Sequence, residues 1–319
     1  MLTPELLHYF AAATTIFLAA IGGGIGQGIA GFGVINAMNR QLEGREENFK
    51  ALIIGLALIE SGIVIALVIS LTMLLGTNTN QINWGMALSE LGMGLAVGVS
   101  AAAISISSSF IVKAAAEAIS RQPFFAKKII SVMLLAQSII EAAVIFAFVV
   151  ALLIRTGTHP EMDFVDGIKY FAAGLSICLG CIGPSAGQSI FAYAACKSIG
   201  INKKTYNKIF PFTLLSQAVI ETPLVFCLLI SLIIIYIPVI STKIIYQAAV
   251  LTASFTIGLG TIGASIGIGF AASKAVCQIA EDPNNYAIIV KTALLVEAFV
   301  ESAVIYAMIV ALLLIMKTT

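Results

Sequence analysis

The sequence predicts an all-α membrane protein of eight transmembrane helices, arranged as four tandem helical hairpins. The chain of 319 residues is 60% hydrophobic and only 10% charged, whereas soluble domains carry about 25% charged residues. It holds eight apolar stretches, each longer than the roughly 20 helical residues that cross a bilayer. A short motif centred on a glutamate also recurs four times at a nearly constant interval. These three observations define the predicted fold.

Short polar links separate the apolar stretches and mark the ends of the helices. We expect helices at residues 5–39, 49–76, 82–120, 127–155, 163–199, 207–237, 243–280 and 286–316. Several exceed the thickness of a bilayer, so their ends should tilt or project into water. Paired in order, the helices give four hairpin repeats, which we place at residues 1–80, 81–160, 161–240 and 241–319.

Two kinds of helix alternate along the chain. The first helix of each expected hairpin is rich in glycine, alanine and serine, as in the run Gly22 to Gly28. Small residues let helix backbones approach one another closely within a bilayer. The second helix of each hairpin is bulkier and carries the recurring glutamate. The repeat unit is therefore a small-residue helix followed by a glutamate-bearing helix.

The recurring glutamates lie in the middle of the bulky helices, at intervals of 81, 80 and 80 residues: Glu60, Glu141, Glu221 and Glu301. A charged side chain at the centre of a bilayer costs roughly 2.5–3.5 kcal/mol on insertion scales. Four such residues at a fixed period indicate a repeated ion or proton site, because intramembrane carboxylates are usually functional.

Polar side chains at the depth of the glutamate would complete such a site. Counting 1.5 Å per residue from the first hairpin turn, Gln27 reaches the same depth as Glu60. Together with the Ser61 hydroxyl they would form an all-oxygen cluster, which hard cations prefer. A proton would need only the carboxyl group and one acceptor, so Na⁺ and H⁺ both remain open.

The third hairpin repeats this polar set as Gln188, Glu221 and Thr222. Pro223 lacks an N–H group, so the carbonyl of Val219, four residues earlier, loses its helical donor. That carbonyl is a further expected ligand, although a simple kink explains the proline equally well. We therefore expect Na⁺, if it is the ion, at the Glu60 and Glu221 sites.

The second and fourth hairpins are poorer in ligands. Ser108 takes the place of the glutamine beside Glu141, and Ser302 follows Glu301. Glu297 lies one turn before Glu301 on the same face, and two carboxylates this close should not both ionise. We expect Glu297 to act as a supporting donor or acceptor, with a second ion site as the less favoured alternative.

Charge and cysteine patterns limit the other functions. The net charge of +1 gives no indication of nucleic-acid binding. Cys178-x-x-Cys181 has no second Cys or His pair, so we expect helix packing and no metal or other cofactor. The links within the hairpins hold 13 of the 17 Lys and Arg residues. By the positive-inside rule the hairpin turns should be cytoplasmic and both termini non-cytoplasmic.

Several local patterns resemble the ring-forming c subunit (proteolipid) of rotary ATP synthases and ATPases. They are Gly24-Ile-Gly26-Gln27-Gly28, the turns Arg40-Gln41 and Arg121-Gln122-Pro123, and the glutamate motif of the second helix. The turns resemble the F-type version. Pro184-x-x-x-Gln188 and the Glu-Ser and Glu-Thr pairs resemble the sodium-binding variant, whereas fused hairpins are more typical of V/A-type relatives. The resemblance covers nearly the whole chain as four copies.

The resemblance implies a ring of identical chains in membrane lipid, with the small-residue helices inside. Each glutamate would take up Na⁺ or H⁺ at an interface with the a subunit, and rotation would drive the central-stalk subunits. The stalk would rest on Arg40, Gln41, Arg121 and Gln122, whereas the third and fourth turns lack the Arg-Gln pair. The chain alone would not be an enzyme.

Two other interpretations remain from the residues alone. A secondary transporter with internal repeats would also place acidic residues at the midplane, but no Lys or Arg lies at the depth of the glutamates to pair with them. A purely structural ring that forms a pore would tolerate glutamine at all four positions. A rotor would not.

Overall fold

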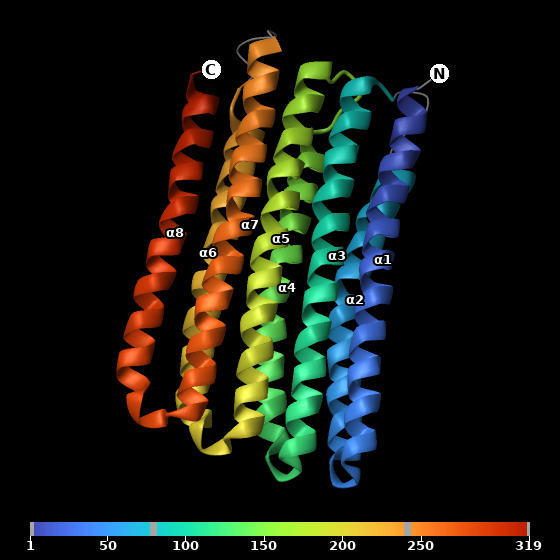
Figure 1. Ribbon diagram of the computed structural model, residues 1–319. Helices are drawn as coiled ribbons and strands as arrows, with labels where there is room; N and C mark the ends of the chain where they lie inside the picture. The colour runs from blue at the N-terminus through green and yellow to red at the C-terminus, as the bar shows by residue number, and fades with distance from the viewer. Residues whose placement is uncertain (1–2, 77–81, 239–243, 318–319) are drawn as a thin grey trace.

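The computed structural model describes residues 3–76, 82–238 and 244–317. These residues form eight long helices (Figure 1), which are α1 (Pro4–Arg40), α2 (Arg45–Gly76), α3 (Trp84–Arg121), α4 (Ala126–Gly157), α5 (Phe164–Ile201), α6 (Tyr206–Tyr236), α7 (Ile244–Glu281) and α8 (Tyr286–Met316). All eight are long and apolar enough to cross a membrane. The predicted all-α fold of four hairpins is confirmed.

Three-residue 3₁₀ turns join the two helices of each hairpin, namely η1 (Leu42–Gly44), η3 (Pro123–Phe125), η4 (Lys203–Thr205) and η5 (Pro283–Asn285). The second helix begins at Arg45, four residues before its expected start, because Glu46 and Glu47 favour the positive end of the helix dipole. The other bounds differ from expectation by at most two residues. Residue 243 and the repeat boundaries after residues 80 and 240 lie outside the described residues.

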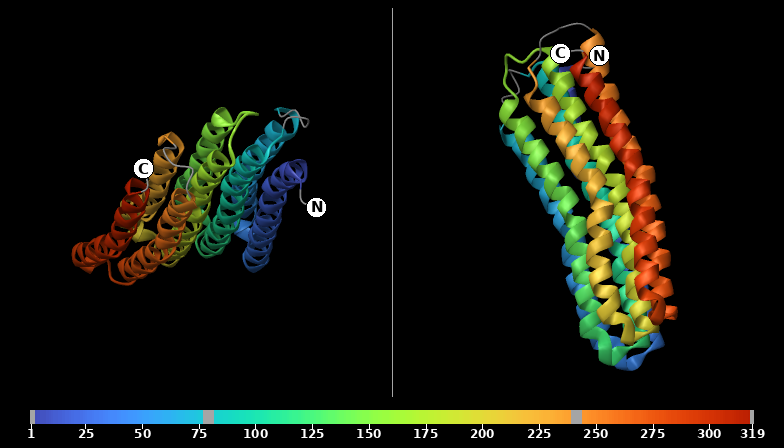
Figure 2. Two further views of the ribbon diagram at one scale, coloured as in Figure 1. Left: turned by 90° about the horizontal axis from the view of Figure 1, so that it is seen from above. Right: turned by 90° about the vertical axis from the view of Figure 1, so that its left-hand side faces the viewer.

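The helices form two curved layers. The small-residue helices α1, α3, α5 and α7 make one continuous row in which each contacts the next, and α2, α4, α6 and α8 make the other (Figures 1 and 2). Helices α2, α4 and α6 each pack between two small-residue helices, for example α2 between α1 and α3. Both termini lie at one end of the bundle and the hairpin turns lie at the other (Figure 1).

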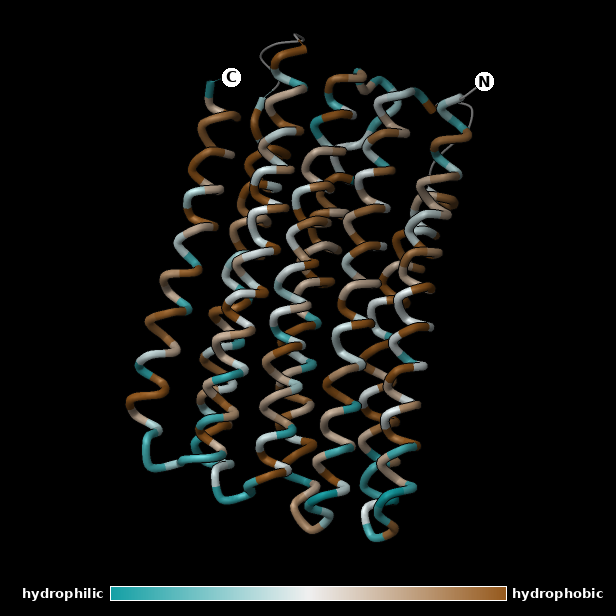
Figure 3. Tube along the Cα trace, viewed as in Figure 1, coloured by the Kyte–Doolittle hydropathy of each residue, from teal (hydrophilic) through white to brown (hydrophobic). Residues whose placement is uncertain are grey.

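Close backbone contact holds the small-residue row together. A Cβ atom added to Gly187 on α5 would lie 2.2 Å from the carbonyl oxygen of Ser265 on α7. One added to Gly26 on α1 would lie 2.4 Å from the carbonyl oxygen of Ser105 on α3. Without a hydrophobic driving force in lipid, helices gain stability from this tight packing. Polar residues gather at the turns and apolar residues fill the middle of the helices (Figure 3).

The two ends of the row leave similar small-residue faces uncovered. A Cβ atom added to Gly24, Gly28 or Gly31 on α1, or to Gly263 on α7, meets no described atom within 4 Å. Inside the row the equivalent of Gly263 is in tight contact, since a Cβ atom added to Gly183 of α5 would lie 2.5 Å from Cα of Ile262 on α7. The bundle therefore ends in two edges that have the features of its internal contacts.

We predict that Gly187→Val lowers the free energy of unfolding by roughly 1–3 kcal/mol, the usual cost of overpacking. The opposing atoms belong to a helix backbone, which cannot move aside as a flexible side chain could. Thermal unfolding of the purified protein in detergent measures this loss. The matched control is Ala57→Val on the exposed face of α2. Equal melting temperatures for the two variants would show that the α5–α7 contact is not tight.

Candidate functional site

Gln27 and Glu60 lie at the same level of the first hairpin. A Cβ atom added to Gly23 would lie 2.1 Å from Cδ1 of Ile63, so these two positions face each other across α1 and α2. Gln27 lies one turn beyond Gly23, and Glu60 lies about one turn back along the antiparallel α2. The Glu60 side chain is exposed and that of Gln27 is half-buried.

The Ser61 hydroxyl serves the glutamate of the next hairpin. Its Oγ donates to Oε2 of Glu141 over 2.6 Å and lies 2.8 Å from the carbonyl oxygen of Leu58 on its own helix. Glu141 is 8% exposed, and within the described residues its buried Oε1 has no hydrogen-bond partner. The expectation that Ser61 would complete the site of Glu60 is therefore corrected. Because α2 packs between α1 and α3, the residue after Glu60 points across the hairpin boundary.

A glutamine one turn before Glu141 extends this cluster. Gln137 is fully buried, and its Nε2 lies 3.0 Å from Oγ of Ser108 and 3.5 Å from the carbonyl oxygen of Gly55. Ser108 thus contacts Gln137, which contributes the amide that sequence reasoning did not assign to this site. Gln137, Glu141, Ser61 and Ser108 make a polar group between the first and second hairpins.

The third hairpin is arranged differently. Gln188 is 1% exposed, and its Nε2 donates to the carbonyl oxygen of Gln217 over 3.4 Å. The Thr222 hydroxyl donates to the Ala218 carbonyl of its own helix over 3.2 Å. The expected pairing of Thr222 with Glu221 is therefore not what the structure shows. Glu221 is half-buried.

Val219 lies one turn before Pro223 within a continuous α6. The proline thus sits inside the helix rather than ending it, and the Val219 carbonyl lacks its usual helical donor. The half-buried Val219 stays a candidate backbone ligand on the helix that carries Glu221.

Glu297 in the fourth hairpin is fully buried and receives a hydrogen bond from the preceding hairpin. Oγ of Ser216 donates to its Oε1 over 3.0 Å. The Ser302 hydroxyl donates to the Phe299 carbonyl over 2.7 Å, and Glu301 beside it is half-buried. Ser216 was missed in the sequence because its partner lies 81 residues away. Glu297 therefore has a supporting contact across a hairpin boundary, as Glu141 does.

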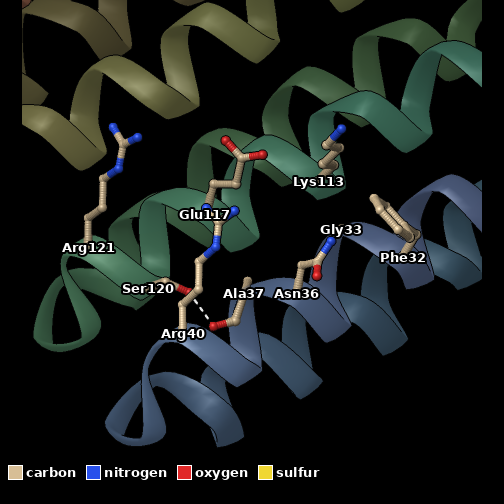
Figure 4. A pocket seen from close by; sticks show the side chains of 9 residues that line it. All are labelled: Phe32, Gly33, Asn36, Ala37, Arg40, Lys113, Glu117, Ser120 and Arg121. Carbon is tan, nitrogen blue, oxygen red and sulfur yellow. Dashed lines mark hydrogen bonds between the residues drawn. The ribbon is translucent and has the colours of Figure 1, made fainter.

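The Arg-Gln pairs lie at the ends of α1 and α3. Arg40 and Arg121 are exposed, and the backbone N–H groups of Gln41 and Gln122 cap the helices by donating to carbonyls of the last turn. Figure 4 shows a pocket between α1 and α3, with Arg40 extending toward Glu117 and Arg121 pointing away. Both arginines are therefore exposed at the turn end, with Glu117 lining the same pocket.

A buried ionic cluster joins the first two hairpins near the end that holds the termini. Nδ1 of His8 lies 2.5 Å from Oε2 of Glu90, and both side chains are fully buried. Nη1 of Arg155 lies 3.7 Å from Oε1 of Glu90, and its Nη2 donates to the Gly76 carbonyl over 2.6 Å. The three side chains come from α1, α3 and α4, so no sequence spacing indicates this cluster.

Comparison with known proteins gives one consistent result. The family model for the C subunit of ATP synthase matches four times, at residues 10–73, 91–154, 171–234 and 251–314. The ATP synthase c subunit from Dehalococcoides mccartyi is 39% identical over 72 residues, which is 23% of this chain and 95% of that protein. Those from a Cyanothece strain and from Euglena gracilis chloroplasts are 46% and 44% identical over 70 and 72 residues. These matches cover 22% and 23% of this chain, and 85% and 89% of those proteins.

We predict that Ser61→Ala increases carbodiimide modification of Glu141 roughly threefold to tenfold at a given pH, and leaves Glu60 unchanged. The hydroxyl stabilises the carboxylate by an interhelical hydrogen bond of about 0.6–1.4 kcal/mol, and carbodiimide attacks the protonated form. Mass spectrometry of the glutamate-containing peptides measures each site. Ser138→Ala is the control, since the Ser138 hydroxyl bonds only the Leu134 carbonyl of its own helix. A change at Glu60 instead would contradict the observed pairing.

Proposed function

Because the chain belongs to the family of ATP synthase c subunits, as a fused form with four hairpins, we propose that it is a membrane rotor subunit. Glu60, Glu141, Glu221 and Glu301 carry Na⁺ or H⁺, and ion flow is coupled to rotation of the central stalk. The observation that carries this proposal is the Ser61–Glu141 hydrogen bond. It joins a mid-membrane carboxylate to a ligand from the adjacent hairpin, so each site lies where two rotor units meet.

Identical chains complete the ring in this proposal. Head-to-tail contacts between copies generate a ring when the rotation closes. The uncovered small-residue edge of α1 and the edge formed by α7 and α8 support such a contact. Exposed Glu60 lies at the first edge, and Ser302 lies at the second. A neighbouring copy would therefore bring Ser302 to Glu60, as Ser61 is brought to Glu141 within the chain.

The other partners follow from the family. The a subunit exchanges ions at the outer face of the ring, where the glutamate-bearing helices lie. The central stalk rests on the turns, with Arg40, Gln41, Arg121 and Gln122 as the contact residues. The chain is an integral, multi-pass membrane protein. We place the turns in the cytoplasm and both termini on the other side, because the basic residues concentrate at the turns.

The arrangement of the glutamates disfavours a secondary transporter. A transporter would gather its carboxylates around one central pathway between repeats. Here the glutamates are distributed over α2, α4, α6 and α8, which follow one another along one layer (Figure 2). A large ring in detergent supports the rotor, and a small monomer or dimer supports the transporter.

Na⁺ is the ion to test first. The groups available around the glutamates are hydroxyl, amide and carboxylate oxygens, which are the ligands that hard cations prefer. Gln27 and Gln188 supply the amides in the first and third hairpins.

Carbodiimide modification of the purified complex, with and without sodium at alkaline pH, tests the proposal. We expect all four glutamates to react without sodium and to be protected by it. Glu46, in the first turn of α2, is an exposed carboxylate outside the site. It serves as the control, since sodium should not change its modification. Modification that ignores sodium but depends on pH would make the protein a proton rotor. No modification at any of the four glutamates would reject the ion-carrier role.

A further inference from the structure

In the Glu141 site the hydroxyl comes from the preceding hairpin. Within the chain, Ser61 directly follows Glu60 in sequence but donates to Glu141. The residues that occupy the same repeat position are Ala142, Thr222 and Ser302. By analogy with the Ser61–Glu141 contact, advancing each by one hairpin assigns Ala142 to Glu221 and Thr222 to Glu301, whereas in this single chain the Thr222 hydroxyl donates to the Ala218 carbonyl of its own helix. Ser302 then serves Glu60 of a neighbouring copy.

Ala142 gives the Glu221 site no hydroxyl. Within the part of the chain that the structure describes, the Glu221 carboxylate has no hydrogen-bond partner. Gln217, one turn earlier, is fully buried, and neither its Nε2 nor its Oε1 is paired among the described residues. By contrast, the equivalent Gln137 donates to Ser108, and Glu141 receives a hydrogen bond from Ser61. A buried amide with both atoms unpaired costs free energy unless a ligand fills the site.

A second set of contacts also sets this boundary apart. Ser105 of α3 donates to the Ile59 carbonyl of the preceding hairpin over 3.0 Å. Ser265 of α7 likewise donates to the Ile220 carbonyl over 3.4 Å. The equivalent Ser185 of α5 donates instead to the Cys181 carbonyl of its own helix. Two hydroxyl contacts thus link the first and second hairpins at the level of the glutamate. The described residues show neither of the equivalent contacts between the second and third hairpins.

We propose that the four ion sites are chemically unequal, and that Ala142 makes the Glu221 site the weakest in ion binding. The ion at Glu221 keeps a water molecule where a hydroxyl would stand, next to the unpaired Gln217 amide. The proposal rests on the proposed role of the glutamates as ion carriers. The residue at position 142 thus determines how strongly Glu221, 79 residues later in the sequence, binds its ion.

Ala142→Ser in the assembled ring tests this assignment. We expect carbodiimide modification of Glu221 without sodium to slow roughly threefold to tenfold, from the strength of an interhelical hydrogen bond. The sodium concentration that half-protects Glu221 should fall by a similar factor if the ion is Na⁺. Glu141, which directly precedes the substituted residue, should not change.

Ala298→Ser is the matched control. It adds the same hydroxyl on an exposed position, where Ser138 already stands in the second hairpin and bonds its own helix. We expect no change at any of the four glutamates. Thr222→Ala is a second, independent test, and it only removes atoms. It should increase the rate of modification of Glu301 and leave that of Glu221 unchanged.

Slower modification of Glu141 in Ala142→Ser, or faster modification of Glu221 in Thr222→Ala, would overturn the assignment by showing that the hydroxyl acts within its own hairpin. Unchanged rates at Glu221 in the first variant and at Glu301 in the second would overturn it as well. Failure of the wild-type ring to react at any glutamate is a different result, because it rejects the ion-carrier role itself.

Discussion

A carboxylate in the middle of a bilayer depends on the polar groups that other helices bring to it. Glu141 is nearly inaccessible to solvent, and the one described hydrogen bond to its carboxylate comes from Ser61 of a different hairpin. Lipid offers no substitute for such a donor. The hydrogen bond to this carboxylate therefore depends on the contact between the hairpins, and the packing of the helices determines both.

The small-residue layer provides that packing. Backbone-to-backbone contacts such as Gly187 against Ser265 bring neighbouring hairpins close and fix their register. With α1, α3 and α5 in this contact, α2 fits into the groove between α1 and α3, and its residues Ile59, Ser61 and Gly62 contact the next hairpin. A bulkier first layer would widen this groove and separate Ser61 from Glu141. The glycines thus act on the site without touching it.

The sequence predicts the helices well, because the apolar signal is local, and it singles out the glutamates because their recurrence is strictly periodic. Apolar length determines each helix, and the recurrence of one glutamate motif identifies Glu60 and its three equivalents. The hydrogen-bond donors to Glu141 and Glu297 could not be predicted in this way, since each comes from the preceding hairpin. Reasoning within one hairpin therefore paired Ser61 with the wrong glutamate. The His8–Glu90 contact was missed for the same reason, because two residues 82 positions apart provide no sequence spacing that would indicate it.

Fusion of hairpins into one chain allows the residues at each hairpin boundary to differ. In a ring of separate identical hairpins, every boundary has the same residues, and a substitution alters all sites at once. In a fused chain, the three internal boundaries and the one between copies are encoded independently. Ser61, Ala142, Thr222 and Ser302 occupy one repeat position, and three of them carry a hydroxyl whereas Ala142 does not. In the rotor that we propose, rotation would present these sites to the same stator in a fixed order. The weakest of them would then set the lowest ion concentration at which a full turn proceeds, and the strongest would set how readily the ion is released.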